Sequence, residues 1–272
     1  MTKREFAGML AEEAKKMGMD AEVDDIFRAD GAYVAVILKK DDGRPVPRIF
    51  IDDLFEAFEG GMPLEKVKAD FVEKAKFANE MALDWVNEHI ADWTWAKERM
   101  VLRLVPADRK EYLAGCVHRK AADLAVVCSV LISDETAASV TPSLLENWKV
   151  TEEELFQTAA GNTDPVVSDI ADVIELGGAG SGGMTVLTSR YQRFGAGAIL
   201  CEGIQEQLDA IYPEGSYLLP SSIHEWIVVG KDNDPEWLQQ MVKDTNRTVL
   251  CPRDILSDNI YTLEGGVLKV VC

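Results

Sequence analysis

The spacing of hydrophobic residues predicts several amphipathic helices. After Pro63, apolar side chains recur at steps of three and four as far as Trp85, which indicates a long helix that ends near Ile90. Thr2 and Glu5 have the spacing of a capping box, so a helix is expected to begin at the N-terminus. Further helices are predicted at 109–115, 141–148, 202–211 and 234–245, and after a second capping box at 151–154.

Strands are predicted where apolar residues alternate with polar ones, or form short runs bounded by Gly, Asp or Pro. The predicted strands are 22–27, 33–38, 48–51, 100–105, 122–132, 184–188, 196–200, 216–219, 226–229, 260–263 and 267–271. The run 122–132 is apolar almost throughout, which is typical of a strand covered on both faces. Gly265 and Gly266 predict a hairpin between the last two strands.

Strands and helices mix along the chain without strict βαβ alternation. This pattern predicts an α+β fold with mixed, mostly antiparallel sheets and flanking helices. We expect two sub-domains, 1–98 with the long helix and 99–272 with a glycine-rich loop at 177–183. With 272 residues, of which 47% are hydrophobic, the chain is long enough to bury a sizeable core.

The charge is strongly negative, with 47 Asp and Glu against 28 Lys and Arg, a net charge of −19. A surface this acidic repels phosphate backbones and anionic lipids, so we expect neither nucleic acid nor a membrane as a partner. Ten acidic residues and one basic residue, Lys149, lie between Asp134 and Glu175. This stretch is either a solvated face or a docking face for a basic protein partner.

Cysteine usage and the N-terminus bear on the compartment. The five cysteines are an odd number at wide spacings, which fits neither a disulfide framework nor a zinc site. The first residues are charged and have no apolar leader, and no segment is long enough to span a membrane. We therefore predict a cytoplasmic protein.

Ser222 and His224 are the strongest candidates for catalysis. In an extended segment their side chains point to the same face, and Glu225 or Asp254 could assist the imidazole in a hydrolase-like site. Neighbouring positions on one strand seldom aim a hydroxyl at an imidazole, and no GxSxG motif is present. A polar network that fixes the start of a strand is therefore an alternative, and a ligand or partner pocket is another.

Such a pocket is predicted from residues near the end of the chain, where arginines could bind a carboxylate. Its candidate residues are Ser221, Ser222, His224, Arg247 and Arg253. We expect no cofactor, because the GxGxxG match at 178–183 precedes a strand instead of a helix. We expect no metal, because the three histidines lack a ligand spacing and 232–234 lacks the rest of a calcium loop.

Three blocks of sequence resemble a known bacterial family. They are 140–163 (VTPSLLENWKVTEEELFQTAAGNT), 218–229 (LLPSSIHEWIVV) and 241–261 (MVKDTNRTVLCPRDILSDNIY). In this order they are similar to domain of unknown function 5688. The resemblance implies a soluble protein of Gram-positive, gut-type bacteria, and it brings no activity, cofactor or catalytic residue.

The leading hypothesis is a cytoplasmic binding or regulatory protein that recognises a protein or a small ligand. A hydrolase-like enzyme centred on Ser222 and His224 is one alternative. A structural subunit of a larger assembly is another, which an exposed apolar patch at Trp93 and Trp95 would favour. The sequence leaves the ligand, the partner and the oligomeric state open.

Overall fold

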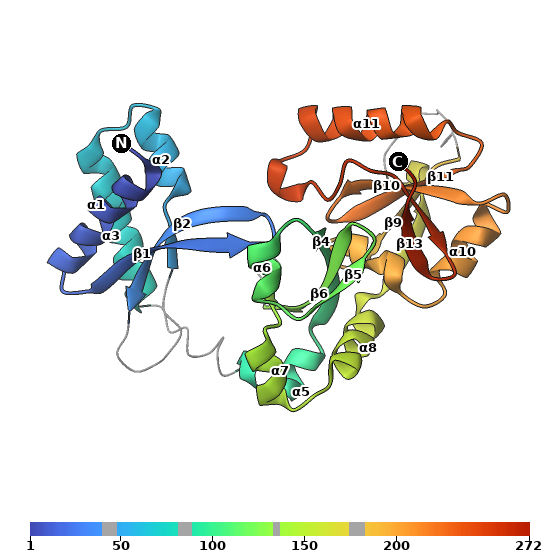
Figure 1. Cartoon of the computed structure of the whole chain (residues 1–272). Helices are drawn as coiled ribbons and strands as arrows, with labels where there is room; N and C mark the ends of the chain where they lie inside the picture. Colours follow the sequence, from blue (N-terminus) through green and yellow to red (C-terminus); the bar gives the residue numbers. More distant parts are fainter. Residues whose placement is uncertain (40–47, 81–88, 133–136, 174–182) are drawn as a thin grey trace. The chain divides into compact units, whose positions relative to one another are not determined.

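The computed structural model describes residues 1–39, 48–80, 89–132, 137–173 and 183–272. The chain divides into two compact units, Met1–Ile90 and Ala91–Cys272 (Figure 1). The division expected from the sequence, between residues 98 and 99, falls inside the second unit. Helices combine with three sheets whose strand pairs are antiparallel, so the predicted α+β class is confirmed.

In the first unit, the helices α1, α2 and α3 pack against a three-stranded sheet. Its elements are α1 (Lys3–Lys16), β1 (Asp20–Arg28), β2 (Gly31–Lys39), β3 (Arg48–Phe50), α2 (Asp52–Glu59) and α3 (Leu64–Glu80). The sheet has the order β1-β2-β3. The capping box at the start of α1 is confirmed, because the Glu5 amide donates to Thr2 Oγ1 at 3.2 Å and the Thr2 amide donates to Glu5 Oε2 at 2.8 Å.

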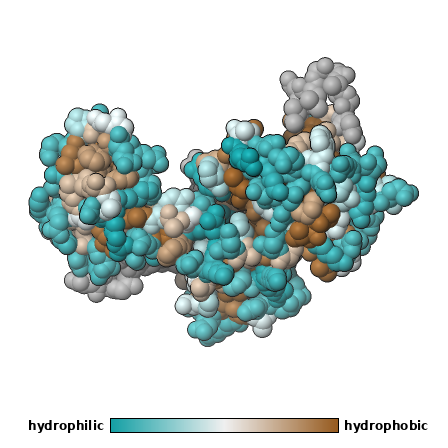
Figure 2. All heavy atoms as spheres, turned by 45° about the horizontal axis from the view of Figure 1, so that its top comes forward, coloured by the Kyte–Doolittle hydropathy of each residue, from teal (hydrophilic) through white to brown (hydrophobic). Residues whose placement is uncertain are grey.

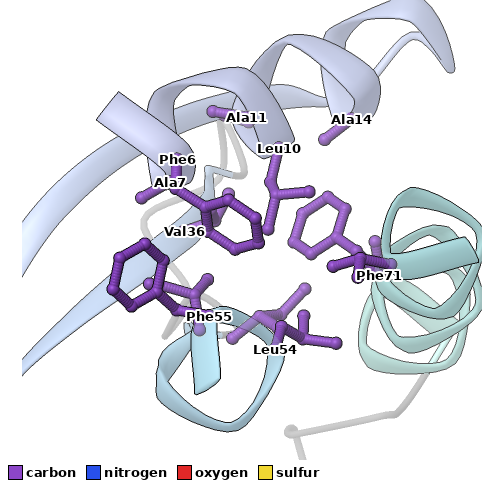
Figure 3. Packing of buried hydrophobic residues seen from close by; sticks show 14 of the residues in the cluster. Phe6, Ala7, Leu10, Ala11, Ala14, Val36, Leu54, Phe55 and Phe71 are labelled. Atoms are coloured by element: carbon purple, nitrogen blue, oxygen red, sulfur yellow. The ribbon is translucent and has the colours of Figure 1, made fainter. Parts of the chain in front are cut away.

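Phenylalanine side chains from α1, α2 and α3 pack in the core of this unit, among aliphatic side chains of the helices and the sheet (Figure 3). Phe6 and Phe71 are fully buried, and the Phe6 and Phe55 rings meet edge to face with centroids 5.3 Å apart. Phe6 and Leu10 lie four residues apart on α1 and therefore face the core together. The apolar periodicity in the sequence thus determines which face each helix buries.

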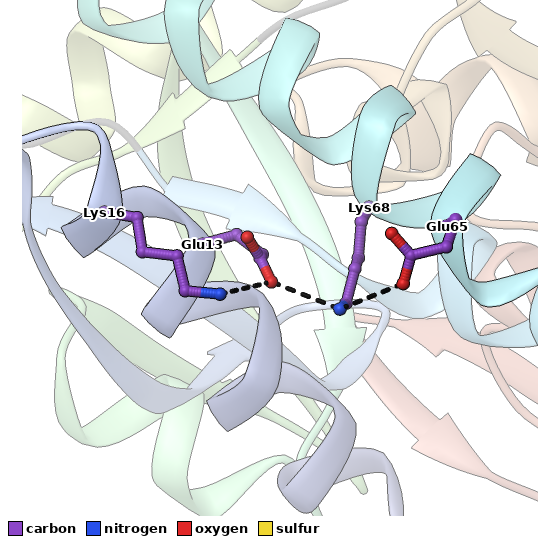
Figure 4. A network of polar contacts seen from close by, with 4 residues as sticks. All are labelled: Glu13, Lys16, Glu65 and Lys68. Atoms are coloured by element: carbon purple, nitrogen blue, oxygen red, sulfur yellow. Dashed lines mark hydrogen bonds and ion pairs between the residues drawn. The ribbon is translucent and has the colours of Figure 1, made fainter.

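An ion-pair network joins α1 to α3 at the surface (Figure 4). Lys68 Nζ lies 3.2 Å from Glu13 Oε1 and 3.3 Å from Glu65 Oε1, and Glu13 also pairs with Lys16 at 3.0 Å. Hydrogen bonds from Lys16 and Lys68 lower the pKa of Glu13. Exposed pairs of this kind contribute little, so the aromatic core dominates the stability of the unit.

The second unit contains two sheets. The smaller one has the order β4-β6-β5, and β7 pairs with the far end of β6. Its strands and helices are α5 (Trp93–Lys97), β4 (Met100–Pro106), α6 (Lys110–Ala114), β5 (His118–Ala121), β6 (Leu124–Leu131), β7 (Ala137–Ser139), α7 (Pro142–Trp148) and α8 (Glu152–Thr163). All residues of β6 except Leu131 are buried, as its uninterrupted apolar run predicts.

The larger sheet has six strands in the order β13-β12-β10-β11-β9-β8. Its elements are β8 (Pro165–Asp169), α9 (Ile170–Val173), β9 (Thr185–Ser189), η1 (Gly195–Leu200), α10 (Ile204–Ile211), β10 (Ser216–Ser222), β11 (Glu225–Gly230), α11 (Pro235–Thr248), η2 (Pro252–Asp254), β12 (Tyr261–Glu264) and β13 (Val267–Val270). Helix α11 lies along this sheet and buries Leu238 and Val242 against Leu219 and Val229 (Figure 1).

One predicted strand is wrong. Residues 196–200 form a 3₁₀ helix, and Gly195 and Gly197 allow its backbone to approach neighbouring residues more closely than a side chain would permit. A Cβ atom on Gly195 would lie 2.4 Å from the carbonyl oxygen of His224, and one on Gly197 would lie 2.5 Å from that of Leu102. The glycine-rich loop at 177–182 and the stretch 81–88 of the predicted long helix lie outside the described residues.

Replacing Phe71 by Ala is expected to lower the free energy of unfolding of the first unit by about 3–5 kcal/mol, because it leaves a cavity in the aromatic core. Phe77→Ala on the same helix is the matched control, since that ring is 67% exposed. Denaturant unfolding measures both variants. Equal losses for Phe71→Ala and Phe77→Ala would contradict the packing described here.

Candidate functional site

Ser221, Ser222 and His224 lie at the tight connection between β10 and β11. The buried Ser222 hydroxyl accepts the His224 amide proton at 3.0 Å, and the Ser221 hydroxyl donates to Glu225 Oε1 at 3.1 Å. Among the described residues, Ser222 forms no hydrogen bond with the imidazole. Both hydroxyls therefore act within the turn, and the serine–histidine pair that nucleophilic catalysis needs is not formed.

The imidazole of His224 is held by the loop before η1. Its Nδ1 accepts the Phe194 amide proton at 3.1 Å, so the ring proton sits on Nε2, 3.8 Å from Asp254 Oδ1. The His224 and Phe194 rings stack at 6.0 Å, and the guanidinium of Arg103, on β4, lies 4.1 Å from the centroid of Phe194. These contacts fix the ring in a packed junction.

Burial lowers the pKa of His224. The positive charges of Arg193 and Arg103 act in the same direction, while Asp254 and Glu225 oppose them. His224 is therefore neutral in the folded chain at neutral pH, as its acceptor role at Nδ1 requires. The sequence left three hypotheses for this segment: catalysis, a ligand or partner pocket, and a polar network at the start of a strand. The observed contacts are those of the polar network.

A cavity of about 600 Å³ lies nearby, in the second unit. Its walls come from the C-terminal half of α11, the loop after β4, the turn before β6 and the segment 252–258. This volume is in the range that holds a small organic ligand. Apolar walls come from residues such as Pro106, Leu124, Ile255 and Leu256, and the lining also includes six charged side chains.

Three of those six side chains are basic: Arg109, Lys243 and Arg247. Within the described ranges, the nearest carboxylate to each arginine is 4.0 Å away, Asp108 for Arg109 and Asp244 for Arg247. Lys243 forms no ion pair with any described residue. Arg109 Nε is buried and has no hydrogen-bond partner among the residues that the structure describes. The positive charges of this cavity are thus weakly neutralised from within the chain.

The other three charged side chains are acidic: Asp108, Asp123 and Asp258. Asn246, buried on α11, donates to Asp258 Oδ1 at 2.7 Å and to the Ser257 carbonyl at 3.0 Å, which fixes 257–258 beside the helix. Asn259 donates to Asp123 Oδ2 at 2.9 Å. Amide groups therefore orient two of the three carboxylates.

The buried hydroxyl of Tyr261 interacts with Ser257 and Asp123, which line the cavity, but forms no hydrogen bond of good geometry within the described part of the chain. Burial raises the pKa of Tyr261 far above its usual range, against a smaller lowering effect from Ser257. The phenol therefore keeps its proton at any ordinary pH. An unsatisfied polar atom beside a polar cavity is a feature that needs a partner.

The structure divides the residues of the predicted pocket between two places. Arg247 lines the cavity, whereas Ser221, Ser222 and His224 do not, and the exposed Arg253 lies on η2 outside the lining. The segment 252–255 joins the two places, because Ile223 donates its amide proton to the Asp254 carbonyl at 2.9 Å while Pro252 and Ile255 face the cavity.

Sequence reasoning missed Arg109, Lys243, Asp123 and Asp258. One available signal was the four-residue spacing of Lys243 and Arg247, which places both side chains on one face of α11. This face is adjacent to the apolar face that contains Leu238 and Val242. The other three side chains come from separate turns of the chain, so no local pattern brings them together.

A second cavity, of about 400 Å³, lies between β5, α8 and β13. Arg119 spans it, with its guanidinium 4.1 Å from the Phe156 ring centroid and 2.9 Å from Glu153 Oε2. This arginine already has both an aromatic and an acidic partner. The cavity therefore offers a ligand fewer free charges than the first one does.

Residues of the acidic stretch 134–175 and the side chain of Trp93 make contacts within the fold. Glu153 pairs with Arg119, and Asp164 pairs with Arg190 at 2.8 Å. Trp93 packs on Trp148 with centroids 5.3 Å apart. Asp134, Glu135 and Glu175 lie outside the described residues.

The described part of the chain contains neither a metal-ligand cluster nor a membrane-spanning helix. It contains no group of three or more His, Cys, Asp or Glu side chains placed to hold a metal ion. None of the helices in these ranges is long and apolar enough to cross a bilayer. On the face drawn in Figure 2, hydrophilic side chains predominate and hydrophobic ones gather in separate patches.

Fold and site together define an α+β protein with a charged cavity in its second unit. The chain belongs to the family of unknown function DUF5688, whose model matches residues 3–264. This finding confirms the resemblance noted in the sequence blocks. Comparison with curated proteins and with solved structures gives no match.

His224 is expected to make stability pH-dependent. Its folded pKa lies below the ordinary 6.5, so its contribution is complete above about pH 6.5 and is lost as the pH falls through the folded pKa. His224→Asn keeps an acceptor for the Phe194 amide and removes the titration, so its stability should fall less than that of the wild type between about pH 7 and about pH 5. Denaturant unfolding across this range measures the difference.

His224→Ala is the matched variant, because it also removes the acceptor. It should cost about 1–3 kcal/mol at neutral pH by leaving the Phe194 amide unsatisfied. An identical pH dependence in the wild type and His224→Asn would show that the imidazole does not accept this proton in solution.

Proposed function

We propose that this chain is a binding protein whose cavity beside α11 recognises the carboxylate group of a small ligand. The observation that supports it is the convergence of Arg109, Lys243 and Arg247 on one cavity, where the ion pairs that the described residues offer the two arginines are as long as 4.0 Å. Arginine and lysine bind carboxylates through charge-assisted hydrogen bonds, and arginine can do so with two parallel bonds.

The energetics of α11 support the same proposal. Lys243 and Arg247 are four residues apart and therefore neighbours on the helix surface, where two like charges destabilise a helix. An anion bound between them would turn this repulsion into attraction. In a chain with a net charge of −19, the formal charges of this lining balance, three positive against three negative, so its basic side chains can attract an anionic group locally.

The proposed setting is the cytoplasm, without nucleic acid as a partner. All five cysteines are free thiols and Cys251 is exposed, which suits a reducing compartment. The strong negative charge disfavours phosphate backbones. A basic protein partner at 134–175 is a second proposal, supported by the exposed Glu146, Glu152 and Glu154.

The test is carboxylate binding to the full chain, measured by calorimetry with hexanoate and succinate as probes and chloride at matched ionic strength as the reference. Arg109→Gln, and separately Lys243→Gln with Arg247→Gln, should weaken binding by about 10- to 100-fold, the usual worth of hydrogen bonds to charged groups. The matched control is Arg190→Gln, which removes one cation from the same unit outside the cavity.

The proposal predicts that Arg190→Gln binds the probes as the wild type does. Absence of binding by every carboxylate, or equal binding by the cavity variants and the wild type, would overturn it. Circular dichroism of each variant confirms that the folded chain is being compared.

A further inference from the structure

The cavity beside α11 is lined by charged side chains of both signs, a basic set (Arg109, Lys243 and Arg247) and an acidic set, here called its basic and acidic poles. Its lining holds three basic and three acidic residues, yet the closest ion pair within the described lining is the 4.0 Å contact from Arg109 Nε to Asp108 Oδ1. Asp123 and Asp258 form no ion pair with any residue that the structure describes.

Neutral amides hold the acidic pole in place. Asp258 receives a hydrogen bond from Asn246 and Asp123 receives one from Asn259, each on one carboxylate oxygen. In each case the second oxygen has no hydrogen-bond partner among the described residues. The carboxylates are thus oriented before a ligand arrives, which reduces the entropy lost on binding.

The basic pole comes mainly from a different element. Lys243 and Arg247 project from α11, whereas Asp123 belongs to the turn between β5 and β6. Leu124, Ile255 and Leu256 add apolar surface to the same cavity. The lining therefore combines cations, apolar surface and fixed carboxylates.

From this arrangement we infer that the ligand is an amino-acid-type zwitterion, with its carboxylate at Arg109, Lys243 and Arg247 and its ammonium group at Asp123 and Asp258. The inference rests on the proposed function and adds the second pole to it. The ammonium group supplies three donors, which matches the open carboxylate oxygens and excludes ligands that carry only negative charge.

The experiment compares ligands that differ only in the amine. Leucine is paired with 4-methylpentanoate, and 6-aminohexanoate with hexanoate, so that a short and a long separation of charges are both tested on the full chain by calorimetry. In at least one pair the amino compound should bind about tenfold more tightly or better, as a charge-assisted hydrogen bond implies.

Asp123→Asn and Asp258→Asn should remove this preference while leaving binding of the amine-free acid equal or tighter. Each asparagine keeps an acceptor oxygen for its amide partner, so the local fold is retained. Asp209→Asn, on the exposed surface of α10, is the control for the change in net charge and should keep the preference.

The outcomes separate the two claims. If the amine-free acids bind and the amine adds nothing in either pair, the zwitterion inference is overturned and carboxylate recognition stands. The zwitterion inference is also overturned if the preference for the amine survives in both aspartate variants. If none of the four compounds binds, both claims fail.

Discussion

The architecture of the second unit depends on how one edge of strand β4 is covered. Strand β4 pairs with β6 on one side only, and its other edge is covered by α8 and η1. The Leu102 amide donates to Thr163 Oγ1 at 3.0 Å, and Gly197 brings η1 against the Leu102 carbonyl. An uncovered edge would leave backbone donors and acceptors without partners and open to pairing with other chains. Here that edge becomes the joint between the two sheets, because Trp226 of β11 donates to the Ala196 carbonyl of η1 at 2.7 Å.

The same joint explains the role of His224. The sequence suggests a catalytic histidine, whereas the structure shows a histidine that holds the connection between the two sheets. The glycine at 195 allows the loop to approach the His224 carbonyl, which brings Phe194 under the imidazole. A neutral ring that accepts a backbone proton suits this packed position better than a residue that exchanges protons with a substrate. The open, charged surface lies on the other side of the 252–255 segment, where side chains of three connections meet α11.

Much of the fold could be predicted from local patterns. The cap at Thr2, the apolar steps of α1 and α3, the continuous run of β6 and the hairpin at Gly265 and Gly266 each depend on a few neighbouring residues, and the structure shows them as predicted. The 3₁₀ helix at 196–200 was not predicted, because the close contacts of this segment are with Leu102 and His224, which are distant in sequence. Strand β8 was not predicted either, since its five half-buried or exposed residues lack a clear alternation of apolar and polar side chains.

The sequence by itself determined much of the secondary structure, the net negative charge and the family, because each follows from residue type and short-range spacing. It also marked Arg247 as a ligand-binding candidate. Only the tertiary structure decided that Arg109, Asp123 and Asp258 share a cavity with it, and that Ser222 and His224 do not form a reactive pair. The physical reason is that a binding site is set by directions of side chains on separate elements, and those directions depend on how the sheets are joined.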